Sequence, residues 1–413
     1  MYENKLKALK PPLCLFFSAV VFGTILHAKH QKHRRYLTPI FLFSAYHSLA
    51  TPHQFSCCLP LFSLWDLSVG LYVLHALSLF HIEQWPAPTP PVNFPPTLQE
   101  FKWRAATTYR LWGNPRVLIP QKEAKEREQQ QTYTDFAIQR IAKAALYYTL
   151  LSHLAPFING HLIGDIQPAD VNSTQRTFFR SLLHALVSRE GPQSAAPLLQ
   201  PRSLLVRAHT AVFWILESVA YLDGANALLG LFFVCVMRVD EPADWPRLFG
   251  SPAAAVSLTA LWSEFWHQLA TRPYGNIGRT ISRQVFGLDV SKSRAAKTIT
   301  AGVVFMLSGA THAVVSWQGG FRDWHLEIWW FFANFCACAL ETGSRGVCRR
   351  NSSRSRMLRY LQREDRAWIA RVLGRLWVFA FFCWSVPKWQ YARLEKQAIA
   401  RVEVERLRRI LSL

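Results

Sequence analysis

Residues 298–317 read TITAGVVFMLSGATHAVVSW, a mostly apolar stretch with Ser308, Thr311 and His312 in its second half. The hydrocarbon core of a bilayer is about 30 Å thick, and a helix needs about 20 apolar residues to cross it. This stretch has that length and contains no Asp, Glu, Lys or Arg. It therefore predicts a membrane-spanning helix that carries one histidine at bilayer depth.

Apolar runs of similar character recur along the 413-residue chain, and Lys and Arg gather mostly between them. Half of all residues are apolar and only 18% are charged, against about 25% charged in an average soluble protein. These features predict an all-α, polytopic membrane protein with roughly seven to nine transmembrane helices. Besides 298–317, the runs are 11–28, 36–50, 57–80, 134–160, 204–222, 225–237, 253–270, 324–340 and 376–386.

The formal net charge of +21 has more than one source. Cytoplasmic loops of membrane proteins are enriched in Lys and Arg, which would place loop 29–35 and the region after 81 on the cytoplasmic side. A basic entrance that attracts a phosphorylated substrate is a second explanation, and both can hold. No zinc-finger spacing, RNP-type aromatic motif or basic-region heptad is present, so we expect no nucleic-acid partner.

We expect a single integral membrane domain over 1–413, in four parts. N-terminal helices occupy 11–81, a polar excursion with an interfacial helix occupies 82–202, the membrane core occupies 203–390, and a charged tail occupies 391–413. Asp223-Gly224 is expected to separate two apolar runs inside the core. The last run, 376–386, is short and has basic flanks, so it either crosses the membrane or is re-entrant.

Ionisable side chains at bilayer depth are costly, and each is a candidate functional residue. The candidates are Asp66, Glu217, Glu264, His267 and His312. The simplest role for the first two is hydrogen bonding between helices. Two histidines alone do not make a metal site, because a third ligand is usual and none stands four residues from either. We therefore predict no metal.

His312 has a neighbourhood that suits proton transfer. Ser308 lies four residues before it on the same helical face, and the small Gly309 allows close approach to the backbone. A neutral imidazole in apolar surroundings has a lowered pKa and accepts a proton at neutral pH. Spacing alone leaves a purely structural histidine as the alternative.

Two motifs together carry a family resemblance. Residues 261–268 read LWSEFWHQ, and residues 308–312, about 45 residues after His267, read SGATH. The pair resembles the membrane-bound O-acyltransferases, in particular the wax synthase-like branch with its fungal members that acetylate terpenoids and meroterpenoids. Residues 109–117, YRLWGNPRV, resemble a third segment of that branch. The family often has Gly-Arg-Arg between the two tryptophans, where this chain has Ser-Glu-Phe at 263–265.

The resemblance implies an acyltransferase that moves an acyl group, here favoured as acetyl, from acyl-CoA to a hydroxyl of a hydrophobic secondary metabolite. CoA is then a co-substrate and no cofactor is resident. The chemistry would take place in a membrane-embedded chamber, and the resemblance further implies residence in the endoplasmic reticulum.

The resemblance also implies roles for individual residues. His312 would be the base that activates the alcohol, and His267 would orient a reactant or stabilise the developing oxyanion. Trp262 and Trp266 would line the tunnel. The remaining candidates for binding substrate or donor are Gln268, Ser308, Arg272, Arg279 and Arg283, of which the three arginines could replace the missing Arg-Arg pair.

Three alternatives remain open at this point. A wax ester synthase would use the same chemistry with a long-chain donor. A membrane hydrolase would use Ser308 with His312, and a proton-coupled transporter would use His312 with Glu264 as a relay. Consumption of acyl-CoA that depends on an alcohol separates the acyltransferases from the other two.

Overall fold

A computed structural model of the chain describes residues 2–50, 59–89, 98–116, 131–187, 199–351 and 367–411. Within these ranges the chain forms helices and connecting turns, with no strand. Parts of the predicted polar excursion (90–97, 117–130 and 188–198) and the first residues of the run predicted at 57–80 lie outside the described residues.

Five helical segments in the described ranges are long and apolar enough to cross a membrane. Their presence confirms the prediction of an all-α, polytopic membrane protein, whereas the expected total of seven to nine helices stays a prediction. The five segments are Ala8–His27, Phe62–Ile82, Pro201–Val236, Arg294–Gln318 and Trp368–Leu411. The apolar run 324–340 lies, apart from Trp324, in a further helix, α14 (His325–Asn351).

The chain forms two compact units that interleave in sequence. The first consists of Met1–Ile119 and Gln268–Phe335, and the second of Pro120–His267 and Cys336–Leu413. The four-part division drawn from the sequence stays a prediction.

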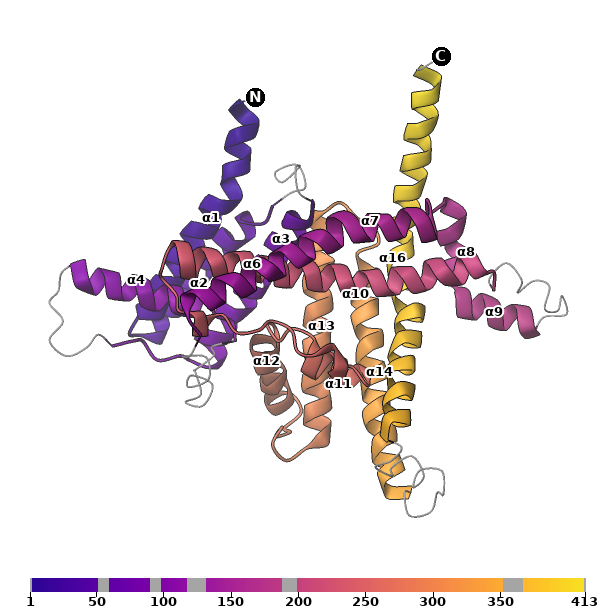
Figure 1. The fold of residues 1–413 in the computed structure, drawn as a ribbon. Coiled ribbons are helices and arrows are strands. Elements are labelled where there is room, and N and C mark those ends of the chain that lie inside the picture. The colour runs from indigo at the N-terminus through magenta and orange to yellow at the C-terminus, as the bar shows by residue number, and fades with distance from the viewer. Residues whose placement is uncertain are drawn as a thin grey trace. The chain divides into compact units, whose positions relative to one another are not determined.

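The first unit is a group of helices around an aromatic and aliphatic core (Figure 1). Phe22 and Leu79 are fully buried there, and Phe41 is almost so. Its elements are α1 (Tyr2–His27), α2 (Gln31–His47), α3 (Leu59–Leu77) with the π-helical turn η1 (Ser78–Ile82), α4 (Leu98–Trp112), α12 (Thr271–Gln284) and α13 (Arg294–Gln318), followed by the start of α14.

Small residues bring the helices of the first unit close together. A Cβ on Gly278 of α12 would lie 3.0 Å from the Cα of Thr300 in α13. A Cβ on Gly309 of α13 would lie 3.1 Å from the Cα of Ile328 in α14. Such contacts are typical of membrane helices, where close backbone approach replaces the hydrophobic driving force.

The second unit is organised by α10 (Pro201–Gly230) and α16 (Ala367–Leu411), which pack on each other. α6 (Tyr133–Thr149) packs on α10 as well. The shorter elements are η2 (Leu150–Leu154), α7 (Ala155–Ile158), η3 (Asn159–Ile163), η4 (Pro168–Val171), α8 (Ser173–Arg176), α9 (Phe178–Val187), η6 (Leu231–Val236), η7 (Pro242–Asp244), η8 (Pro252–Ala254), α11 (Leu258–Ala260) and η9 (Leu261–Phe265).

The helix break expected at Asp223-Gly224 is wrong, because α10 continues through both residues. The negative charge of Asp223 is paired with side chains of α6. Lys143 Nζ lies 2.9 Å from Asp223 Oδ2, and the Tyr147 hydroxyl donates to the same oxygen at 2.8 Å. Gly224 in a helix costs only about 1 kcal/mol relative to alanine. A paired carboxylate and a tolerated glycine therefore allow one continuous helix.

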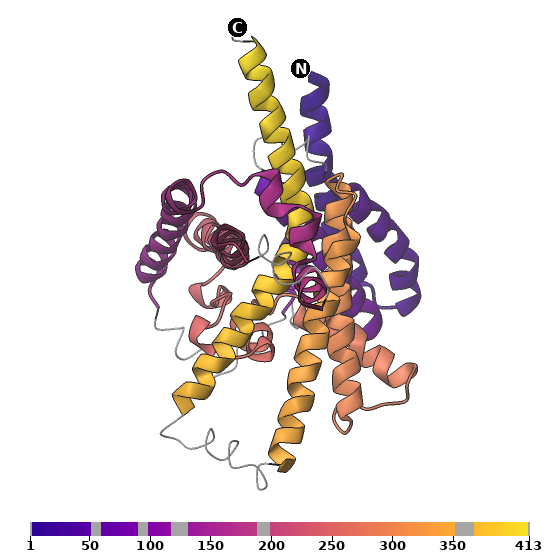
Figure 2. The same ribbon diagram turned by 90° about the vertical axis from the view of Figure 1, so that its right-hand side faces the viewer.

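The charged tail predicted for 391–413 continues α16 as far as Leu411 (Figure 2). Pro387 lies inside this helix. On the same helix Tyr391 is fully buried, with the guanidinium of Arg207 from α10 5.5 Å from its ring centre. Arg207 also donates to the Cys383 carbonyl oxygen at 3.1 Å. The second unit therefore anchors the first turns of the predicted tail.

In the second unit, a non-helical stretch of backbone around Gly250 lies against the end of η9. The Gly250 N–H donates to the Phe265 carbonyl oxygen at 2.9 Å. A Cβ on Gly250 would lie 2.0 Å from the Glu264 carbonyl oxygen, well inside van der Waals contact. Any side chain at 250 must therefore push these two backbones apart.

We expect Gly250→Ala to lower the thermal unfolding midpoint of the detergent-solubilised chain by roughly 5 °C or more, because overpacking displaces backbone. Gly343→Ala is the matched control, since a Cβ there meets nothing within 4 Å. Equal midpoints for the two variants would contradict the close backbone contact.

Candidate functional site

His312 lies on α13 in the first unit and is half-buried. Its ring centre is 5.0 Å from that of Phe331, on α14. The Ser308 hydroxyl donates to the Val304 carbonyl oxygen of its own helix at 2.8 Å. The hydroxyl proton of Ser308 is thus directed at the backbone, which gives no support to a Ser308 nucleophile.

The helical turn that carries His312 is held by neighbours that the sequence analysis did not single out. The Thr311 hydroxyl donates to the Leu307 carbonyl oxygen at 2.8 Å, so the Tyr274 hydroxyl, 2.9 Å away, donates to Thr311. A Cβ on Gly70 of α3 would lie 2.7 Å from the Thr311 methyl group. α12 and α3 therefore both contact the residue next to His312.

A polar cluster joins α12 to η1 in the first unit. Arg272 forms an ion pair with Glu83, and the Asn276 side-chain amide donates to the same carboxylate. Asn276 also donates to the Ser78 hydroxyl at 2.9 Å, and Ser78 donates to Glu83 at 2.9 Å. Arg279 donates to the side-chain amide oxygen of Asn276. The Glu83 carboxylate is thus the centre that fixes the first turns of α12.

The three candidate arginines differ in their surroundings. Arg272, Asn276, Arg279 and Arg283 follow one another at helical spacing along one face of α12. Burial lowers the pKa of Arg272, and the Glu83 carboxylate opposes that effect. Arg279 and Arg283 are exposed. A diffusing anion can therefore reach the two later arginines more readily than Arg272.

Gln268, at the boundary of the first unit, lies just before the start of α12 at Thr271. The Thr271 hydroxyl donates to its side-chain oxygen at 2.7 Å. The Thr271 backbone N–H lies 3.3 Å from the Gln268 carbonyl oxygen. These contacts place Gln268 at the start of the helix that carries the arginines.

His267 lies in the second unit, directly after the short helix of α11 and η9. That helix ends at Trp266, whose N–H donates to the Leu261 carbonyl oxygen at 2.7 Å and whose backbone is extended. The Phe249 ring meets the His267 ring edge-on, with centres 5.7 Å apart. His267 is therefore set by the end of a helix and by an aromatic neighbour.

An aromatic cluster surrounds Trp266. Its ring stacks on Trp214 of α10, with centres 5.4 Å apart and planes 10° apart, and Trp262 meets it edge-on at 5.2 Å. Trp214 also contacts Phe382 and Trp389 of α16. Both predicted tunnel tryptophans thus belong to one packed group in the second unit.

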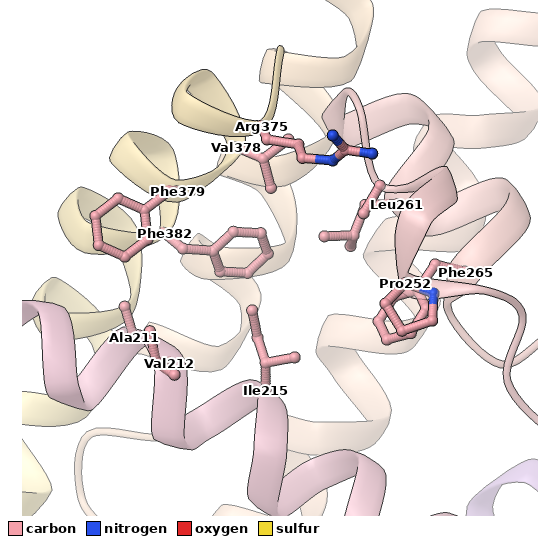
Figure 3. Close-up of a pocket in the computed structure, with 11 residues that line it drawn as sticks. Ala211, Val212, Ile215, Pro252, Leu261, Phe265, Arg375, Val378, Phe379 and Phe382 are labelled. Atoms are coloured by element: carbon pink, nitrogen blue, oxygen red, sulfur yellow. The ribbon is translucent and has the colours of Figure 1, made fainter. Parts of the chain in front are cut away.

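An apolar pocket of about 210 Å³ is lined in part by the short helix that precedes His267 (Figure 3). Leu261 and Phe265 of η9, Ile215 of α10 and Phe382 of α16 line it, and Arg375 is the charged member of the lining. The Arg375 guanidinium donates to the Ala253 carbonyl oxygen at 3.1 Å. The pocket suits an apolar group of modest size.

The structure therefore divides the predicted site residues between the two units. The first unit holds Gln268, Arg272, Arg279, Arg283, Ser308 and His312, and the second holds Trp262, Trp266 and His267. Among the described residues, no group of three or more His, Cys, Asp or Glu side chains could hold a metal ion.

Comparison with known proteins points to one family. Residues 245–333 match the model of the membrane bound O-acyl transferase family. Acetyltransferase nanB of Aspergillus nanangensis is 30% identical over 187 residues, which cover 44% of this chain and 42% of the relative. Acetyltransferase ple2 of Rhodocybe pseudopiperita is 29% identical over 230 residues, 54% of this chain and 56% of the relative.

The chain spans about half the length of the curated relatives it matches. No solved structure matches it at a significant level. The matched residues 245–333 include both motifs, LWSEFWHQ and SGATH. These matches confirm the resemblance of the chain to the membrane-bound O-acyltransferases and to fungal acetyltransferases among them.

Proposed function

We propose that the chain is an acyl-CoA-dependent O-acyltransferase that moves an acetyl group to a hydroxyl of a hydrophobic secondary metabolite, such as a terpenoid. One observation carries the proposal: the family match spans 245–333 and thus contains His267 and His312, each in its motif. The acetyltransferase names of the relatives support the short donor. Residence in the endoplasmic reticulum is part of the proposal.

The proposed reaction is direct attack of the alcohol on the thioester. The acceptor oxygen forms a bond to the acyl carbonyl carbon, and the bond from that carbon to the CoA sulfur breaks. His312 takes the hydroxyl proton as the attack begins and returns it to the leaving sulfur, so no net proton is gained. His267 donates a hydrogen bond to the oxygen that becomes negative in the intermediate.

The CoA phosphates are assigned to the basic face of α12. Arg279 and Arg283 are exposed on this face and offer planar donors that suit phosphate oxygens. Arg272 acts differently, because its ion pair with Glu83 fixes the helix that presents the other two. Arg279 and Arg283 then depend on the half-buried Glu83 carboxylate for the position of their helix.

The apolar pocket is assigned to the hydrophobic body of the acceptor. Its wall residues Leu261 and Phe265 share a short helix with Trp262 and Trp266, which leads into His267. An apolar wall on the helix before a catalytic histidine is a suitable place to hold a water-insoluble alcohol. Exclusion of water there would also protect the thioester from hydrolysis.

We expect His312→Ala to reduce ester formation from acetyl-CoA by at least roughly 100-fold, because loss of a general base costs about 10² to 10⁴. His325→Ala, an exposed histidine of the same unit, is the matched control and should keep full activity. Ester formation is measured by mass spectrometry with equal amounts of folded protein. Normal transfer by His312→Ala would remove the base from the mechanism.

Arg283→Gln is expected to raise the KM for acetyl-CoA several-fold with little change in kcat. It removes a phosphate contact that is equally strong in the ground state and in the transition state. The effect should shrink as salt is raised, since exposed charges are screened. Arg322→Gln, another exposed arginine of the first unit, should leave KM unchanged. An equal rise in KM for both variants would show general attraction by basic charge rather than a site on α12.

Filling the pocket tests the acceptor assignment. Ile215→Trp places an indole among Leu261, Phe265 and Phe382 and should raise the KM for bulky acceptors strongly, while a short alcohol is still acetylated. Leu216→Trp changes the neighbouring exposed position of α10 and serves as control. Initial rates with a series of alcohols of increasing size give the comparison. An unchanged preference in Ile215→Trp would place the acceptor elsewhere.

A further inference from the structure

The short helix that leads to His267 begins with an unusual capping arrangement. The first N–H groups of a helix have no acceptor within it and must find one outside. Here the Ser257 hydroxyl accepts from the Ala260 N–H at 3.1 Å. The two N–H groups before it, of Leu258 and Thr259, donate instead to the carboxylate of Glu341 at 2.8 and 3.0 Å.

The Glu341 carboxylate receives three more hydrogen bonds, one of them at 3.4 Å from Arg345, which also forms an ion pair with it. The Thr259 hydroxyl donates to it at 2.7 Å, and the indole N–H of Trp377 does so at 2.7 Å. Only 10% of the Glu341 side chain is exposed. Glu341 comes from α14 and Trp377 from α16, so one carboxylate joins two long helices to the motif helix.

The carboxylate of Glu341 is anionic at neutral pH. Burial raises its pKa, but the hydrogen bonds from Thr259, Leu258 and Trp377 outweigh burial and lower the pKa below the ordinary 4.5. Glu341 lies outside the five candidate membrane spans. A negative charge at the N-terminus of a helix also meets the positive end of the helix dipole.

The direction of this helix determines where His267 lies. Only eight residues, Leu258 to Phe265, separate the capped end from the turn at Trp266. The far end is held by the hydrogen bond from Gly250 to Phe265, and the near end by Glu341. A shift at the near end would therefore be carried through a short rigid element to His267.

We propose that Glu341 is a positioning residue for the acyl transfer reaction, which fixes the start of the 258–265 helix and thereby the place of His267. This inference rests on the proposed function. Glu341 does not touch substrate in this proposal, since its two oxygens already accept five hydrogen bonds within the protein. Its effect on catalysis passes through His267.

The first test uses the purified full-length chain with acetyl-CoA and an acceptor that it acetylates. Glu341→Ala should lower kcat by roughly 10- to 100-fold, as expected for a displaced catalytic group, with the KM for acetyl-CoA little changed. Glu341→Gln retains one acceptor oxygen and should restore part of kcat. Glu405→Ala, an exposed carboxylate of the same unit, should match the unmodified chain.

The decisive readout is a double-variant cycle with His267→Ala. Substitutions of residues that act together have strongly non-additive effects on kcat. Glu341→Ala should therefore cause no further loss of kcat in the His267→Ala background. Independent, multiplying losses would overturn the inference, as would an unchanged kcat in Glu341→Ala accompanied only by a lower unfolding midpoint. Failure of the unmodified chain to form any ester is a separate outcome, which would overturn the proposed function and this inference with it.

Discussion

Backbone N–H and C=O groups that lie in a bilayer must find their partners within the protein, because the lipid chains offer none. Helices meet this demand by themselves, and irregular backbone meets it only with help from side chains. In the second unit, the segment between η6 and η9 lies outside the five candidate membrane spans, and side chains pair its backbone groups in a similar way. Arg140 donates to the Trp245 carbonyl oxygen, Arg375 donates to that of Ala253, and Glu341 accepts from the N–H groups of Leu258 and Thr259.

Long charged side chains near the motif therefore serve as hydrogen-bond partners of irregular backbone. Non-helical backbone at membrane depth is found where it is buried in protein or lines a cavity. The irregular segment leads into the short helix whose Leu261 and Phe265 line the apolar pocket and whose Trp262 packs in the tryptophan cluster. In the first unit, the Glu83 carboxylate plays a comparable role where the π-helical turn η1 meets α12. It accepts hydrogen bonds from Ser78 and Asn276 and forms an ion pair with Arg272.

The sequence allowed the helical class and the membrane setting to be predicted, because run length and charge distribution are local properties. The two histidine motifs were also found from the sequence, since each is a short pattern. The assigned roles of His267 and His312 stay predictions. The break expected at Asp223-Gly224 was wrong because the partner of Asp223, Lys143, lies 80 residues away on α6.

The same reasoning explains which residues were missed. Glu341 stands 83 residues from Leu258, and Glu83 stands 189 residues from Arg272. No periodicity or spacing connects such pairs, and only the packing of the helices brings them into contact. Their sole local signal is a carboxylate at the edge of an apolar run, which also fits an ordinary residue at the end of a membrane helix.

Acyl transfer from CoA to an alcohol is the step on which the proposed function and the roles of His267, His312 and Glu341 all depend. The direct measurement incubates the purified chain with acetyl-CoA labelled in the acetyl group, with and without a panel of terpenoid and fatty alcohols. Mass spectrometry follows both the labelled ester and free CoA. We expect equal amounts of labelled ester and free CoA, formed only when an alcohol is present. CoA released without an alcohol, or acetyl-CoA left intact with every acceptor, would contradict this expectation.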